Sequence, residues 1–219
     1  MSINRQHSFW GPLSPFGGLT GAGLLIMASA RLSWAVAVAV SLFWVYGLTT
    51  LTFAFLLSAL EKKFFPIAGR VILYTCIAAF FGSVYLLMFW LVCPFAAFEN
   101  FLLLMLVPLF CASSGIIDQI LIQHKKAQSD IFDYVTDALS QAASLAGLIV
   151  AFSVLREPFA YCSLSFPGSY QGMFTIMYFK AGTFFPIGIL APSAGALLLL
   201  GFIISLYQSN KAKIFSGRI

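Results

Sequence analysis

A cysteine and an aspartate stand inside one apolar segment, where both side chains could do chemistry. Cys111 lies about nine residues into a run of roughly twenty, near the centre of a bilayer if the run spans one. Asp118 follows about two turns later, and an ionised aspartate in a membrane favours a bundle interior or a water-filled path. Both could instead be structural, because membrane cysteines often serve as small packing residues and Asp118 could lie at the interface.

Three further charged residues border the next apolar run. Asp137 precedes it and could complement the dipole of the helix that it opens. Arg156 and Glu157 close it, and they could form a helix-end charge pair or bond to other groups at the interface. We therefore treat Asp118, Asp137, Arg156 and Glu157 as candidates either for an ion path or for structural charges.

The sequence lacks the patterns of a self-contained enzyme. It has no nucleophile triad and no glycine-rich phosphate loop, and His7 and His124 lie in or beside expected loops. No CxxC or other metal-ligand spacing relates Cys76, Cys93, Cys111 and Cys162. We expect no catalysis by this chain alone.

Composition places the chain in a membrane. Hydrophobic residues make up 61% of its 219 residues and charged residues 9%, whereas soluble domains carry about 25% charge. The net charge of +5 does not indicate nucleic-acid binding, because the basic residues lie between apolar runs and form no patch. This composition excludes a soluble globular protein.

The apolar runs predict an all-α integral membrane protein with six transmembrane helices in one domain, 1–219. At about 20 residues per span, the expected spans are 13–30, 32–60, 71–92, 101–122, 137–155 and 183–207. A polar and aromatic loop, 156–182, precedes the last span. Residues 23–31 resemble the end of a signal peptide, but glycines interrupt the apolar stretch before them, so we interpret it as a retained first helix.

Lysine and arginine residues predict the orientation. With the N-terminus in the cytoplasm, Arg31, Arg156 and Lys180 fall outside, and the other nine of the 12 basic residues fall inside. This bias follows the positive-inside rule. We expect a multi-pass protein of the bacterial inner membrane with both termini in the cytoplasm.

The first and fourth runs are both short and interrupted by small residues or proline, and a longer helix follows each. Interrupted segments at corresponding places in two halves indicate an inverted repeat with its site at the midplane. We therefore expect an inverted 3+3 repeat with broken first and fourth helices. Alternatively, the small residues only let helices pack closely.

Several short motifs follow one another along almost the whole chain. They are GLLIMASA at 23–30, Pro66, Arg70 and Tyr74 at intervals of four, Cys111 with Gly115, Asp137, Leu155-Arg156-Glu157, and LAPSAG at 190–195. In order and approximate spacing this series resembles the six-helix subunits of the Rnf and Nqr ion-translocating redox complexes. The Ala191-Pro192 ending is similar to the E-type Rnf branch (RnfE/NqrD-type).

The resemblance implies a [2Fe–2S] cluster shared with an inverted RnfA/NqrE-type paralogue. Each subunit would supply midplane cysteines from its first and fourth helices, which satisfies the four thiolates that such a cluster needs. Cys111 matches the fourth-helix position, but the first-helix position falls near Ala22, which has no donor atom. Ile116, Asp118, Ala160 and Cys162 also depart from the family pattern.

We therefore expect a divergent membrane subunit of an Rnf-type electron-transport complex. Its partners would be the paralogue, flavin-bearing subunits of the RnfD and RnfG type, and the lipid bilayer, with electron flow coupled to movement of Na⁺ or H⁺. Two alternatives stay open. One is a substrate-capturing component of a small-molecule, vitamin-type importer, with an outward pocket near 158–182. The other is a cofactor-free structural subunit.

Overall fold

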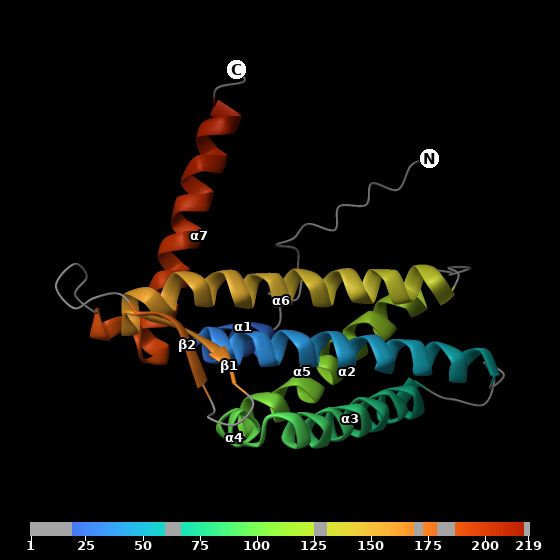
Figure 1. Ribbon diagram of the computed structural model, residues 1–219. Helices are drawn as coiled ribbons and strands as arrows, with labels where there is room; N and C mark the ends of the chain where they lie inside the picture. The colour runs from blue at the N-terminus through green and yellow to red at the C-terminus, as the bar shows by residue number, and fades with distance from the viewer. Residues whose placement is uncertain (1–18, 60–66, 125–130, 169–172, 179–186, 217–219) are drawn as a thin grey trace.

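A computed structural model describes residues 19–59, 67–124, 131–168, 173–178 and 187–216 of the chain (Figure 1). These residues are mostly helical, and three helices are long and apolar enough to cross a membrane. The three candidate spans are Leu32–Leu56, Gly69–Val92 and Ala138–Tyr161. The expected helical fold with membrane-spanning helices is confirmed to this extent, and the six spans with an inverted repeat stay a prediction.

The first helix is much shorter than the two that follow it. α1 (Leu19–Ala28) has 10 residues and is therefore about 15 Å long, about half the thickness of the hydrocarbon layer. A tight turn leads into α2 (Leu32–Ala59), and α3 (Ile67–Val92) returns along it. α1 therefore has the length of a half-helix.

A short helix reverses the chain between α3 and α5. α4 (Pro94–Glu99) begins with a proline, which suits the first turn because its missing N–H would have no helical partner there. The buried Asn100 donates from Nδ2 to the carbonyl of Ala96 at 2.7 Å. α5 (Phe101–His124) begins directly afterwards, so Asn100 fixes the angle between the two helices.

The sixth helix ends in a β-hairpin. α6 (Ile131–Tyr161) stops where Cys162 adopts a left-handed backbone, with φ of 52°. Strand β1 (Ser163–Pro167) then pairs with the antiparallel strand β2 (Met173–Tyr178), with a bulge between Leu164 and Ser165. This hairpin lies inside the segment expected as a loop, so the fold is not wholly helical.

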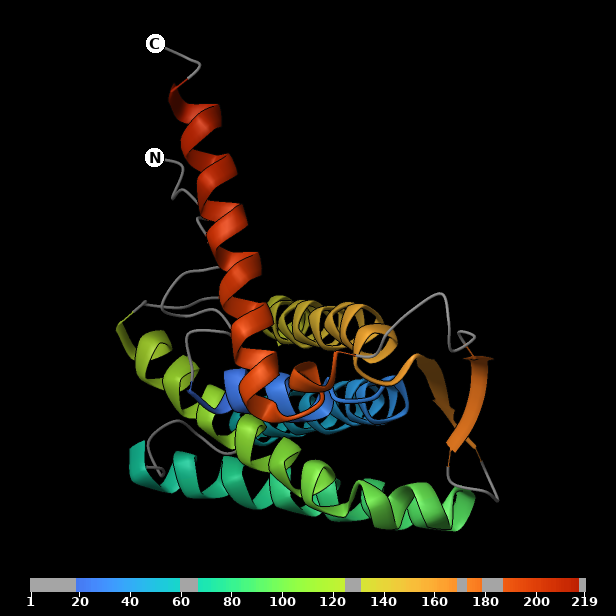
Figure 2. The ribbon, with the colours of Figure 1, turned by 90° about the vertical axis from the view of Figure 1, so that its left-hand side faces the viewer.

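The last helix leaves the bundle. A 3₁₀ turn, η1 (Gly188–Leu190), leads through Pro192 into α7 (Ser193–Ser216). A Cβ at Gly195 would collide with the backbone of Ile189 and Leu190, so only glycine allows this tight reversal. α7 contacts η1 and α1 near its start and then points away from the other helices (Figures 1 and 2).

α2 is the centre of the packed helices. It has its most extensive contact with the antiparallel α6 and also packs on α3, α5 and β1. Small residues allow the α2–α6 approach: Gly47 lies against Leu139, and Ala138, Ala142 and Ala146 are buried. The Tyr46 hydroxyl, near the middle of α2, donates a hydrogen bond to Gln141 Oε1 of α6 at 3.3 Å.

Several expected boundaries differ from the structure. α6 begins at Ile131, so Asp137 lies more than a turn inside it, and α7 begins only at Ser193, after Pro192. α5 is one continuous helix with Pro108 inside it, so the expected break of the fourth run is wrong, and the small residues at 112–115 are tolerated in the helix. α1, with 10 residues, and α5, with 24, are therefore of unequal length.

Gly82 sets the distance between α3 and α5. A Cβ at this position would collide with the ring of Pro108, which cannot rotate away. We expect Gly82→Ala to lower the free energy of unfolding by about 1–3 kcal/mol through overpacking. Thermal unfolding in detergent measures this effect.

Gly147→Ala on α6 is the matched control, because a Cβ there meets nothing within 4 Å. It should be neutral or stabilise the helix by up to about 1 kcal/mol. Equal melting temperatures for the two variants would contradict the proposed close contact.

Candidate functional site

Arg156 is the most completely bonded side chain in the described part of the protein. It lies near the end of α6, is 1% exposed, and uses all five of its guanidinium N–H groups. Its acceptors are the Ile26 carbonyl (2.8 Å), Ser29 Oγ (3.2 Å), and the carbonyls of Leu190 (2.9 Å), Ala191 (2.8 Å) and Pro192 (3.1 Å). One side chain therefore joins the end of α1 to the turn before α7.

Glu157, the next residue, bonds in the opposite direction. Its Oε2 accepts a hydrogen bond from the backbone N–H of Leu32 at 2.7 Å, and its Oε1 accepts one from Ser165 N–H at 2.9 Å. Leu32 is the first residue of α2, so the carboxylate caps that helix and ties the hairpin to it. The Glu157 side chain is also 1% exposed.

The two charges match the ends of the helices that they meet. A cation suits the carbonyl end of α1, and an anion suits the N–H end of α2. Their acceptors and donors are backbone groups and a serine hydroxyl, not each other. Of the two roles that the sequence suggests, this geometry fits a structural one, because every N–H of Arg156 and both carboxylate oxygens of Glu157 already have protein partners.

Arg31 lies in the turn between α1 and α2, beside this cluster. Its guanidinium carbon is 5.7 Å from the ring centroid of Trp34 and 5.2 Å from that of Tyr161. Both distances are within the range of a cation–π interaction. The turn is therefore held by Arg156 and Glu157 through hydrogen bonds and by Arg31 through aromatic rings.

Cys111 is fully buried in α5. It belongs to the core cluster that also contains Leu24 and Leu25 of α1, and α1 packs on α5. Ala22 lies in α1, although its side chain is outside the described residues. Alanine has no donor atom, so Cys111 and Ala22 do not fit a cluster that takes two thiolates from each subunit.

The other two charged candidates, Asp118 and Asp137, are acidic residues on two different helices. Asp118 lies in α5 and Asp137 in α6, but the side chains of both are outside the described residues. Of the predicted site residues, Arg156 and Glu157 thus each bond to several segments at the end of α6, and Cys111 lies in the apolar core.

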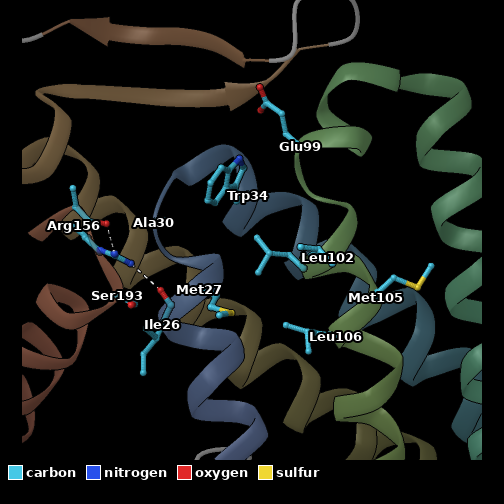
Figure 3. A pocket seen from close by; sticks show the side chains of 12 residues that line it. Ile26, Met27, Ala30, Trp34, Glu99, Leu102, Met105, Leu106, Arg156 and Ser193 are labelled. Atoms are coloured by element: carbon cyan, nitrogen blue, oxygen red, sulfur yellow. Dashed lines mark hydrogen bonds between the residues drawn. The ribbon is translucent and has the colours of Figure 1, made fainter.

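A pocket of about 630 Å³ lies beside the Arg156 cluster (Figure 3). Ile26 and Met27 of α1 and Trp34 of α2 form one side, and Leu102, Met105 and Leu106 of α5 form the other. Arg156, Glu99 and Ser193 add polar atoms at its boundary. Its volume is in the range of small-molecule sites.

Sequence reasoning did not find this pocket or the partners of Arg156. In the sequence, Trp34 is typical of a tryptophan at the membrane–water interface. The backbone carbonyls of Ile26 and Leu190 have no sequence signature. Pro192 is the one available signal, because a proline ends the preceding backbone hydrogen bonding and leaves carbonyls to be satisfied elsewhere.

Comparison with known proteins adds no family assignment. The sequence matches no protein-family model, and no curated protein matches it significantly.

The Arg156 cluster makes a quantitative prediction about stability. Arg156→Lys keeps the charge but has three donors in place of five, so at least two acceptors lose their partner. We expect the free energy of unfolding to fall by about 2 kcal/mol or more, and Arg156→Met to cost still more. Thermal unfolding and the rate of tryptic cleavage at the α1–α2 turn measure the effect.

Arg31→Lys is the control, since it keeps a cation beside Trp34 and Tyr161 and keeps a trypsin site in the turn. It should leave the melting temperature almost unchanged. An Arg156→Met protein as stable as the parent would show that the five hydrogen bonds do not hold the turn.

Proposed function

We propose that this chain is a membrane subunit of an Rnf-type ion-translocating electron-transport complex. In this proposal it pairs with an inverted RnfA/NqrE-type paralogue in a bacterial inner membrane, with both termini in the cytoplasm. Electrons pass across the membrane between flavin-bearing RnfD/RnfG-type subunits, and the complex moves Na⁺ or H⁺.

One observation carries the proposal. The half-length α1 packs against α5, and Cys111 is in the core that they share. A half-helix and a mid-membrane cysteine on neighbouring segments are the two features that the motif series leads us to expect together. The order of α1, α2, α3, α5, α6 and α7 also agrees with six helical segments, and an inverted 3+3 repeat is part of the proposal.

The proposal assigns this chain a scaffold role within the complex. Its donor set does not fit an equal share of a [2Fe–2S] cluster, so Cys111 has no part in electron transfer in this proposal. Arg156 and Glu157 hold α1, α2 and the turn before α7 together, and this fixes the surface that a paralogue would meet. The redox groups then come from the partner subunits.

Purification with partners tests the proposal. The full-length chain, tagged and extracted in mild detergent, should copurify with the RnfA/NqrE-type paralogue and with flavin-bearing subunits. Arg156→Met should reduce that yield more than Arg31→Lys does, because it loosens the docking surface. A chain that never retains the paralogue or a flavin subunit overturns the assignment.

The pocket favours a second candidate function. A cavity of about 630 Å³ near the hairpin suits a substrate-capturing component of a small-molecule importer. Such a chain would copurify with ATPase subunits in place of flavoproteins, so the same purification separates the two functions.

The role of Cys111 has its own test. If the thiol only packs, Cys111→Ser should leave the iron content and the electron paramagnetic resonance signal of the purified complex unchanged. Cys76→Ser, at an exposed position on α3, is the matched control. A [2Fe–2S] signal that disappears only in Cys111→Ser would identify this residue as a ligand and restore the shared cluster.

A further inference from the structure

The pocket beside Arg156 opens among exposed apolar side chains. Leu102, Met27 and Met105, which line it, are 77%, 53% and 40% exposed. All three lie on apolar helices, and α1 and α5 stand on opposite sides of the pocket (Figure 3). In a bilayer these side chains contact acyl chains, so the hollow between them is filled by hydrocarbon more readily than by water.

Trp34 brings one polar group to this apolar space. Its indole Nε1 is buried and has no acceptor among the described residues. A buried N–H without a partner costs about 1–3 kcal/mol, so an acceptor from outside the chain would be favourable. Figure 3 shows the indole ring between the α1 side of the pocket and Glu99.

The charges around Trp34 suit a phospholipid headgroup. Arg31 lies over the Trp34 ring, and Glu99 lines the pocket, so the rim carries both signs of charge. Trp34 is in the first turn of a candidate span, the depth at which interfacial tryptophans meet headgroups and ester carbonyls. Across the pocket from Trp34, α5 runs on into the apolar layer past Leu102 and Leu106.

We propose that this pocket binds one phospholipid molecule. An acyl chain lies between α1 and α5, and an ester or phosphate oxygen accepts the hydrogen bond of Trp34 Nε1. The zwitterionic headgroup places its phosphate toward Arg31 and its amine toward Glu99. This inference is independent of the proposed function, because it requires only the chain and a bilayer.

Two pairs of variants test the site. Trp34→Phe keeps an aromatic ring and removes the N–H, and Trp44→Phe makes the same change on the exposed side of α2, outside the pocket. Met105→Trp fills the pocket, and Leu109→Trp adds the same bulk one turn further along α5, at an exposed position that does not line it.

The full-length protein, with any partners that it retains, is purified in mild detergent and weighed by native mass spectrometry. Delipidated samples are then titrated with phosphatidylethanolamine. The parent, Trp44→Phe and Leu109→Trp should each retain one tightly held lipid. Affinity should fall about fivefold in Trp34→Phe, the loss of one hydrogen bond, and binding should be absent in Met105→Trp.

Equal lipid binding by all five proteins would mean that the lipid is annular, and it would overturn the proposal. So would a parent protein that holds no lipid, or a Met105→Trp protein that loses a partner subunit and keeps its lipid. If Met105→Trp does not fold, the comparison of Trp34→Phe with Trp44→Phe decides the question alone.

Discussion

Backbone carbonyls that end helices inside an apolar environment need hydrogen-bond donors, and much of this structure follows from how that need is met. Where such groups are buried away from water, each unpaired one costs about 1–3 kcal/mol. α1 stops after 10 residues, and the chain also breaks before α7, so carbonyls are left at both places. Arg156 bonds both sets, and Glu157 bonds the N–H at the start of α2.

Because these two residues are adjacent on one helix, the end of α6 determines where four other segments lie. α1, the start of α2, β1 and the turn before α7 all bond to it. A buried charge is costly unless its hydrogen-bonding groups are satisfied. Here a cation and an anion are adjacent in sequence, and each is bonded to backbone or hydroxyl groups of the right polarity. The cluster therefore has little freedom to serve as a moving charge.

The positions of α1, α3, α5 and α7 leave a pocket and exposed apolar faces on this protein. α1 and α5 line the pocket between Trp34 and Leu102, next to the end of α1 that Arg156 holds. α3 is the most exposed of the three candidate spans, and α7 keeps large apolar side chains such as Leu198 and Phe202 at its surface. Apolar surfaces of this extent must meet lipid or other subunits. A subunit that works within a larger membrane assembly is consistent with them.

The sequence by itself determined the membrane environment, the helical segments and the charged residues that matter. Hydrophobic run lengths are local properties, so α2, α3 and much of α5 could be predicted from them. The sequence could not supply the partners of Arg156, because the carbonyls of Ile26 and Leu190 become its neighbours only when segments far apart in the chain meet. The hairpin after Cys162, the continuity of α5 through 112–115 and the pocket beside Trp34 likewise depend on packing between helices. Only the tertiary structure decided that Arg156 and Glu157 cap different helices and do not pair with each other.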